Sequence, residues 1–236
     1  MIRIENLHKR FQKNRVLSGV NLNIRDKGIY AILGPNGSGK TTLIKSILGM
    51  VLPNMGEINV LGSNNKGDWT YREKIDYLPQ IANFPSNLKV QELIHMIKDL
   101  RGASSNRDQE LIELFAVESF LDKKIGNLSG GTKQKVNIIL AFMFDSPILI
   151  LDEPTTGLDP VSLIHLKELI QKEKAKGKTI LITSHIMSFV EEVSDEIVFL
   201  LEGNIHFKGT ISELKEKTKE ENFEKAIAQI LIRKDV

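Results

Sequence analysis

Residues 34–41 (GPNGSGKT) combine side chains and backbone suited to chemistry on phosphate. They match the pattern G-x-x-x-x-G-K-[ST], in which the glycines let successive backbone N–H groups turn toward one anion. A helix that begins at the end of this segment adds partial positive charge. Lys40 can then reach the β- and γ-phosphates of a nucleotide, and the Thr41 hydroxyl can ligate Mg²⁺. The alternative is a flexible glycine turn with a solvated lysine.

A second group of reactive side chains follows an apolar run at residues 148–153 (ILILDE). A buried strand that ends in a carboxylate delivers Asp152 to the carboxyl edge of a sheet, where ligands of α/β proteins bind. Asp152 would hold Mg²⁺, directly or through water. Glu153 could orient or deprotonate a water molecule aimed at the γ-phosphate. The alternative is a helix-cap or turn carboxylate after a core strand, which the glycine-rich segment upstream disfavours.

The elements that must position these residues follow from the hydrophobic pattern. Gly28–Leu33 (GIYAIL) is a candidate buried strand directly before the glycine-rich segment, and residues 40–48 are helical directly after it. Two more buried strands are expected at 148–151 and Thr179–Thr183, with a helix over 160–176 between them. Strand, helix and strand at this spacing predict a parallel α/β sheet with right-handed crossovers.

Other stretches depart from this rhythm. The first 25 residues alternate apolar and polar side chains, which predicts strands, whereas residues 85–145 are mostly helical in pattern, with helices over 90–100 and 109–115. This arrangement favours an α/β core with a helical insertion over two tandem domains. Residues 209–236 are expected to form helices docked on the core, and a contact with a partner stays open as a second role for them.

Composition excludes several classes of function. The 236 residues include 32 Lys and Arg against 30 Asp and Glu, so the net charge of +2 exerts no strong pull toward nucleic acid or anionic membrane. The absence of cysteine excludes a disulfide scaffold and a Cys-ligated metal site. The longest apolar run, residues 138–144, is far shorter than the roughly 18 residues that cross a bilayer. We therefore expect a cytosolic chain without a signal peptide.

Residues 128–132 (LSGGT) add a third motif about 20 residues before Asp152. Together with the two groups above, they resemble the nucleotide-binding subunits of ATP-binding-cassette (ABC) transporters over residues 1 to about 208. In that family this signature serves the nucleotide held by the opposite subunit, through Ser129, Gly130 and Gly131. The usual fifth residue is Gln, and this chain has Thr132, which leaves open which side-chain contacts the fifth position makes.

The resemblance assigns roles to further positions. Gln80, in residues 77–80 (YLPQ), resembles the glutamine that senses Mg²⁺ and water and couples the site to the helical insertion. His185 resembles the histidine that contacts the γ-phosphate, where an imidazole can donate a hydrogen bond without taking a full charge. Asp159 matches the loop that crosses to the partner subunit, and it can also cap the helix that begins at Pro160.

Phe11 occupies the position where the family has an aromatic ring under the adenine, with Val16 beside it; the alternative for Phe11 is a core aromatic. The nucleotide contacts that the resemblance and the motifs imply are Phe11, Val16, Gly34, Pro35, Asn36, Gly37, Ser38, Gly39, Lys40, Thr41, Thr42, Ser129, Gly130, Gly131 and Asp159. The implied catalytic residues are Glu153, His185 and Gln80, and the implied Mg²⁺ ligands are Thr41, Gln80 and Asp152.

For the whole chain, the resemblance implies an α/β fold: a P-loop NTPase core of ABC type with an N-terminal antiparallel β subdomain and an inserted α-helical subdomain. The nucleotide-binding domain would span residues 1–208, with the insertion at about 85–145, and a helical tail would follow at 209–236. The implied activity is ATP hydrolysis by a homodimer that closes head to tail around two Mg-ATP. It would drive a separate membrane-spanning transporter subunit from the cytoplasmic side, as a peripheral protein on the inner face of the cell membrane.

A different class remains as the alternative: a soluble ABC ATPase that acts on DNA or ribosomes. Such relatives usually carry long coiled coils or two cassettes in tandem, whereas this chain has one cassette, no heptad run and a net charge of only +2. No nucleic-acid partner is therefore expected.

The cargo is indicated by resemblance alone. Residues 133–139 (KQKVNII) and 185–192 (HIMSFVEE) are similar to a branch that contains the ATPase subunits of the transporter for copper-site maturation of nitrous oxide reductase, and more broadly to export-type ABC ATPases. This resemblance implies an extracytoplasmic maturation protein as a further partner.

Overall fold

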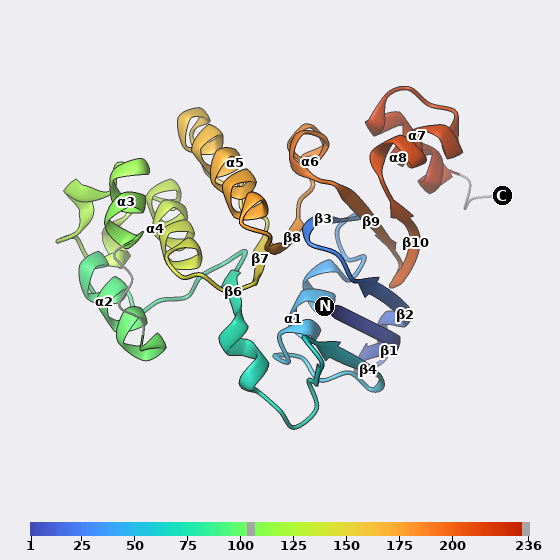
Figure 1. Ribbon diagram of the computed structural model, residues 1–236, viewed down its shortest axis with the longest axis horizontal. Helices are drawn as coiled ribbons and strands as arrows, with labels where there is room; N and C mark the ends of the chain where they lie inside the picture. Colours follow the sequence, from blue (N-terminus) through green and yellow to red (C-terminus); the bar gives the residue numbers. More distant parts are fainter. Residues whose placement is uncertain (103–106, 233–236) are drawn as a thin grey trace. The chain divides into compact units, whose positions relative to one another are not determined.

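The computed structural model describes residues 1–102 and 107–232 (Figure 1). The chain divides into two compact units. The first unit comprises Met1–Arg72 together with the chain from Thr179 onward, and the second comprises Glu73–Lys178. The last four residues of the predicted tail, 233–236, lie outside the described residues.

The first unit opens with an antiparallel sheet. Its strands, in the order β2-β1-β4-β5, are β1 (Ile2–Phe11), β2 (Asn14–Ile24), β4 (Met55–Val60) and β5 (Ser63–Asn64). Ile4 of β1 pairs with Leu22 on one side and Ile58 on the other, and all three side chains are buried. The alternation at the start of the chain therefore produces one apolar face, as predicted.

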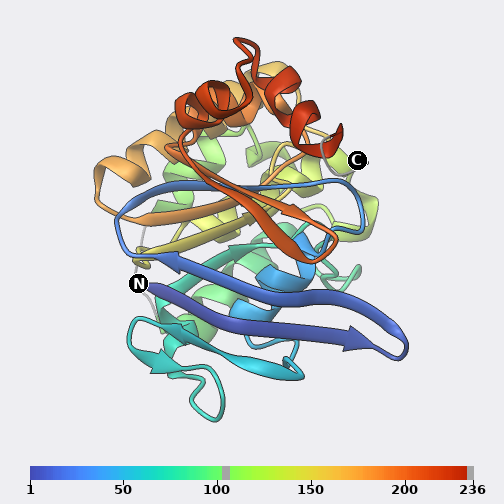
Figure 2. The same cartoon turned by 90° about the vertical axis from the view of Figure 1, so that its right-hand side faces the viewer.

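A second set of strands in the first unit carries the glycine-rich loop. The strands, in the order β10-β9-β3-β8, are β3 (Gly28–Leu33), β8 (Thr179–Thr183), β9 (Glu196–Leu201) and β10 (Asn204–Gly209). β3 runs parallel to β8 and β9, while β10 turns back antiparallel to β9, the orange-red pair in Figure 2. Every residue of β3 and β8 is buried, as expected for parallel strands covered on both faces.

The helices of the first unit are α1 (Lys40–Ile47), α6 (Met187–Val193), α7 (Ile211–Thr218) and α8 (Phe223–Ile232), with a 3₁₀ turn that starts at its edge (Thr70–Lys74). α1 packs against β2 and β4. α7 starts with a capping box, in which Thr210 Oγ1 accepts from the Glu213 backbone N–H at 3.1 Å and Glu213 Oε2 accepts from the Thr210 N–H at 2.7 Å. α8 packs against α6 and α7 and buries Phe223 and Ile227. The described part of the tail therefore contains two helices, which follow the end of β10 at Gly209.

The second unit pairs two parallel strands, β6 (Ile75–Leu78) and β7 (Ile148–Asp152). Its helices are α2 (Val90–Arg101), α3 (Arg107–Leu114), α4 (Gly130–Phe142) and α5 (Pro160–Ala175), with 3₁₀ turns at Glu118–Phe120 and Ile125–Asn127. α4 packs against β6, α2 and α3, so the apolar run at residues 138–144 is the buried part of a helix and its C-terminal turn. Within residues 1–102 and 107–232, no helix has the length and apolar character needed to cross a membrane.

Candidate active site

The glycine-rich loop between β3 and α1 is fixed by packing. Gly34 has φ of +152°, and a Cβ there would lie 2.0 Å from the backbone oxygen of Leu200 and 2.7 Å from Ser38 Oγ. Only glycine fits such a position. The turn between β9 and β10 holds the loop from the same side, since the Gly203 N–H donates to the Ser38 carbonyl at 3.1 Å. The loop is therefore a shaped backbone cradle, which disfavours a flexible turn.

The Lys40 side chain is folded over this loop. It is 9 % exposed, and its Nζ donates to the carbonyl oxygens of Gly34 at 2.7 Å and Pro35 at 3.1 Å. The neighbouring Ser38 Oγ is buried and has no hydrogen-bond partner among the described residues. An unsatisfied buried hydroxyl costs about 1–3 kcal/mol, so a polar ligand that reaches it is favoured.

The start of α1 adds a further feature suited to binding an anion. Gly39 occupies the N-cap in a left-handed conformation, and no side chain caps the first turn. Thr41 and Thr42 follow in that turn and are half-buried. Backbone N–H groups at a helix N-terminus, together with the lysine, form a binding site for phosphate.

His185 lies at the same edge of the sheet as this loop. Ile32 of β3 pairs with Thr183 of β8 in parallel register, so the chain leaves both strands at their carboxyl ends. His185 is exposed, and the adjacent Ser184 is buried, with its Oγ accepting from the Ile186 N–H at 3.1 Å. The first unit thus brings together the loop and the histidine that the resemblance implies.

Val16 and Phe11 lie on the long hairpin of β1 and β2. A Cβ on Gly39 would be 2.9 Å from the Val16 carbonyl oxygen, so the backbone of Val16 lies against the loop. Phe11 ends β1 near the hairpin turn, is 45 % exposed, and has Lys9 Nζ 4.8 Å from its ring centroid. Such exposure excludes the alternative of a core aromatic and leaves a ring face open for stacking.

The second unit holds the acidic pair. Asp152 ends β7 and is 1 % exposed, and Glu153 is 7 % exposed with φ of +52°, which is uncommon for a residue other than glycine. Burial, and then the negative charge of Asp152, raise the pKa of the neighbouring Tyr77, so its phenol stays protonated. Gln80 is exposed two residues beyond β6, and Leu78 pairs with Leu151 in parallel. Gln80 and the acidic pair therefore lie at the carboxyl ends of two neighbouring parallel strands, at the same edge of the sheet.

The signature motif caps α4. Ser129 is the N-cap, and its Oγ accepts from the Thr132 backbone N–H at 3.2 Å and lies 2.8 Å from Thr132 Oγ1. The fifth residue of the motif therefore contacts Ser129 through its hydroxyl, which is what the sequence left open. Ser129 and Gly130 are exposed, so this helix N-terminus can receive an anion from outside the chain.

Asp159 is the N-cap of α5, where its carboxylate accepts from the Ser162 N–H at 2.9 Å and the Ser162 Oγ at 2.8 Å. It also pairs with Lys135 Nζ at 2.8 Å. The Lys135 ammonium and the bonds from Ser162 hold the pKa of Asp159 well below its usual range. Sequence reasoning missed Lys135 and its neighbour Gln134; the available signal is a pair of polar side chains at 134–135 on a helix that becomes apolar afterwards.

The expected metal ligands fit Mg²⁺ by their chemistry. Among the described residues, no group of three or more His, Asp and Glu side chains could hold a metal alone. Mg²⁺ prefers oxygen ligands and is usually held by one or two protein groups with phosphates and water. The Thr41 hydroxyl in the first unit, and the Gln80 amide and Asp152 carboxylate in the second, offer such oxygens.

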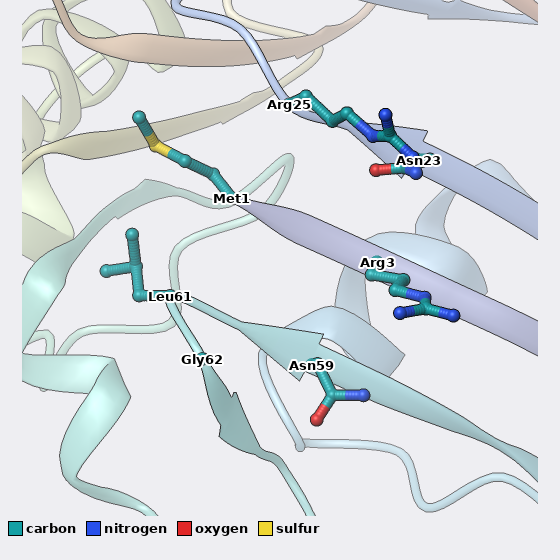
Figure 3. A pocket seen from close by; sticks show the side chains of 7 residues that line it. All are labelled: Met1, Arg3, Asn23, Arg25, Asn59, Leu61 and Gly62. Atoms are coloured by element: carbon teal, nitrogen blue, oxygen red, sulfur yellow. The ribbon is translucent and has the colours of Figure 1, made fainter.

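A separate polar depression of about 500 Å³ lies on the antiparallel sheet of the first unit (Figure 3). Its lining residues are Met1, Arg3, Asn23, Arg25, Asn59, Leu61 and Gly62. Arg3 lies between Asn23 and Asn59 in the strand register and pairs with Glu5. The lining residues come from β1, β2, β4 and the turns beside them. The glycine-rich loop follows β3, so the depression is distinct from the candidate site.

Comparison with known proteins now decides the family. Residues 17–156 match the family model of the ABC transporter. The chain belongs to the ABC transporter family. This ABC ATPase is 34 % identical over 207 residues to the lantibiotic transport ATP-binding protein SrtF of Streptococcus pyogenes, covering 87 % of this chain and 89 % of that protein. It is 33 % identical over 222 residues to the bacitracin transport ATP-binding protein BcrA of Enterococcus faecalis, covering 93 % and 72 %.

Solved structures agree with the fold. A structure described as the ATP-binding subunit of an ABC transporter superposes with a TM-score of 0.90 at 29 % identity and covers 98 % of this chain and 99 % of that one. A dimeric cassette in a post-hydrolysis state, bound to ADP and Pi, gives 0.79 at 26 % identity, with 89 % and 98 % covered. The chain is thus an ATP-binding subunit of an ABC transporter and an ATPase, with the ABC cassette fold that the motifs implied.

Proposed function

We propose that this ABC ATPase is the motor of an exporter and closes head to tail as a homodimer around two Mg-ATP. The observation that carries the proposal is that one chain has two helix N-termini suited to an anion, at α1 behind the loop and at α4 behind Ser129. The first would hold the chain's own nucleotide and the second, which is exposed, the partner's. In this proposal residues 1–208 form the nucleotide-binding domain and 209–236 the tail.

Nucleotide binding would use the groups described above. Phe11 would stack on the adenine, with Val16 at its side, because the ring has an open face. The loop amides and Lys40 would hold the phosphates. Thr41, Gln80 and Asp152 would hold Mg²⁺, which supplies neutralisation of phosphate charge. The remaining loop and partner contacts would come from Gly34, Pro35, Asn36, Gly37, Ser38, Gly39, Thr42, Gly130, Gly131 and Asp159.

Hydrolysis would proceed by attack of water on the γ-phosphorus. The Glu153 carboxylate accepts a proton from the water as the new P–O bond forms, and the bond from the γ-phosphorus to the bridging oxygen breaks to leave ADP and inorganic phosphate. Gln80 orients the water, and His185 donates a hydrogen bond to the γ-phosphate. Lys40 and the loop amides stabilise the charge on the phosphate oxygens. Loss of the γ-phosphate removes the link between the two chains, so the dimer opens.

The transport partner would be a separate membrane-spanning subunit, with this chain on the cytoplasmic face of the membrane. The helical insertion beyond Gln80 would accept it. The names of SrtF and BcrA assign them to lantibiotic and bacitracin transport. Export is supported by a further relative, the Nod factor export ATP-binding protein I of Burkholderia orbicola, which is 34 % identical over 207 residues. Within this proposal, the resemblance of residues 133–139 and 185–192 favours the transporter for copper-site maturation of nitrous oxide reductase, with an extracytoplasmic maturation protein as a further partner.

Co-purification tests this proposal. The chain would be tagged in its native host, extracted gently from membranes and analysed by mass spectrometry, beside an untagged strain. We expect a polytopic membrane protein in about a one-to-one ratio, and a copper- or reductase-maturation protein beside it would identify the pathway. Recovery only from the soluble fraction with ribosomal or DNA-bound proteins would overturn transport and favour the soluble ABC ATPase.

A further inference from the structure

The first turns of α4 are attached to the segment that follows β7, within the second unit. The Gln134 side chain is 6 % exposed, and its Nε2 donates to the carbonyl oxygen of Pro154 at 2.9 Å. Its Oε1 accepts from Asn137 Nδ2 at 3.4 Å. A buried amide with both ends engaged has a defined orientation, so the position of the Pro154 carbonyl depends on α4.

Two more contacts join the same elements. A Cβ on Gly131 would lie 2.7 Å from the Gly157 carbonyl oxygen, so the two backbones touch at a position where only glycine fits. Farther along the segment, Lys135 Nζ pairs with Asp159 Oδ2 at 2.8 Å. Positions three and four apart share a helix face, so Gly131, Gln134 and Lys135 together hold residues 154–159 against α4.

Glu153 directly precedes the attached segment, and its backbone conformation is unusual. Its φ of +52° is unfavourable for any side chain, and it precedes a proline, which disfavours helical backbone conformations in the residue before it. Strained backbone persists only where the surrounding contacts determine it. Proline has no N–H, so the carbonyl is the only backbone hydrogen-bonding group of Pro154, and Gln134 is its side-chain donor.

We propose that Gln134 is a positioning residue for Glu153: its side-chain N–H fixes the Pro154 carbonyl and with it the backbone that aims the Glu153 carboxylate. This inference rests on the proposed role of Glu153 as the base. It also connects two parts of the reaction, because α4 begins with the signature motif at Ser129. The helix that receives the partner's nucleotide is the one that orients this chain's own base.

Two substitutions test the role of the N–H. Gln134→Met keeps a side chain of similar length without a donor, and Gln134→Glu places an acceptor against the carbonyl. A misplacement of the base by about 1 Å lowers the rate by about 100-fold, so we expect kcat to fall by about 10- to 100-fold in both. KM and ATP affinity should stay within about twofold of the wild type, because Gln134 does not belong to the proposed nucleotide contacts.

The pH dependence of kcat distinguishes a positioning role of Gln134 from a role in packing alone. Once protonated, the carboxyl group that Gln134→Glu introduces can donate to the Pro154 carbonyl, and burial raises the pKa of such a group. We therefore expect the kcat of Gln134→Glu, relative to the wild type, to rise as the pH falls from about 8 to about 6. Gln134→Met has no titrating group and should show no recovery. The control Lys133→Ala, next along α4, should keep the wild-type kcat.

The Glu153→Gln variant distinguishes failure of the proposed base from failure of the proposed positioning role. Turnover of Glu153→Gln at the wild-type rate would refute the proposed base itself. If that variant is inactive while both Gln134 variants keep the wild-type kcat, the positioning role is overturned and the base stands. The role is also overturned if ATP affinity falls in proportion to kcat, or if Gln134→Glu shows no recovery in acid.

Discussion

Lys40 Nζ lies 2.7 Å from the carbonyl oxygen of Gly34, so the first residue of the loop holds the ammonium group of the residue that follows the loop. The cation is kept at the helix N-terminus before any phosphate arrives. A bound phosphate would replace neutral carbonyl oxygens by charged ones, which form stronger hydrogen bonds with an ammonium group.

Lys40→Ala should therefore weaken ATP binding. A hydrogen bond to a charged group contributes about 1.5–3 kcal/mol, which corresponds to a loss of affinity of about 10- to 150-fold. The loss of affinity is measured by isothermal titration calorimetry with ATP. Lys45→Ala in the last turn of the same helix is the matched control and should bind like the wild type. An unchanged affinity of Lys40→Ala for ATP would contradict the role of the loop.

Glu153→Gln should bind ATP but not hydrolyse it, because an amide cannot accept the proton of the attacking water. The nucleotide then persists, so the variant should accumulate as an ATP-bound dimer. Light scattering on a sizing column, with and without ATP, would detect it. Glu168→Gln, an exposed position on α5, is the control and should hydrolyse and dissociate normally. A monomeric Glu153→Gln at saturating ATP would count against the closed homodimer.

Local patterns predicted the elements that carry the two central motifs. The apolar runs of β3 and β8 were delimited to the residue, and β7 is one residue longer than its predicted range of 148–151 because Asp152 still belongs to the strand. The helix over 160–176 is observed as Pro160–Ala175. Its start was predictable because Asp159 and Pro160 form a cap and first turn that depend on neighbouring residues only.

Features that depend on distant contacts were not predicted. The turn from β9 to β10 was not predicted, because it is defined by contacts between residues far apart in the sequence. Leu200 and Gly203 contact the glycine-rich loop, and Gly203 also contacts the backbone of Val16. Glu153 has a left-handed backbone, and a conformation of this kind leaves no periodic signal in the sequence. Gln134 was overlooked because polar residues near the start of a helix are usually solvated, whereas here a carbonyl far along the sequence satisfies it.

Phe11→Ala should weaken ATP binding without changing the stability of the fold. Stacking on a base contributes about 1–2 kcal/mol, so affinity should fall by about 5- to 30-fold. The ring is 45 % exposed, so thermal unfolding should shift little. Phe120→Ala removes another aromatic under a lysine, with Lys123 Nζ 4.6 Å from the ring, and is the control for ATP affinity. Unchanged affinity in Phe11→Ala would remove the ring from the nucleotide site.

The second unit contains a buried charge cluster around Glu173 of α5, whose side chain is 1 % exposed. It pairs with Arg107 at the start of α3, with Lys176 at 3.0 Å and with Lys178 at 2.6 Å. Burial alone would raise the pKa of Glu173, but the hydrogen bonds from Arg107, Lys178 and Lys176 outweigh it and lower the pKa from 4.5 to about 2. The folded unit therefore stabilises the ionised form of the Glu173 side chain.

Glu173→Gln should destabilise the protein in a way that depends on pH. Because the pKa is lower in the folded state, the charge stabilises the fold above the unfolded pKa of 4.5 and loses this effect as the pH falls toward 2. The free energy of unfolding in urea should differ between wild type and variant by about 3 kcal/mol at about pH 6–7. The difference should shrink below pH 4.5, while Glu168→Gln, exposed on the same helix, should show none. A difference that stays constant down to about pH 3 would assign the loss to packing, because only the ionised carboxylate attracts the three cations.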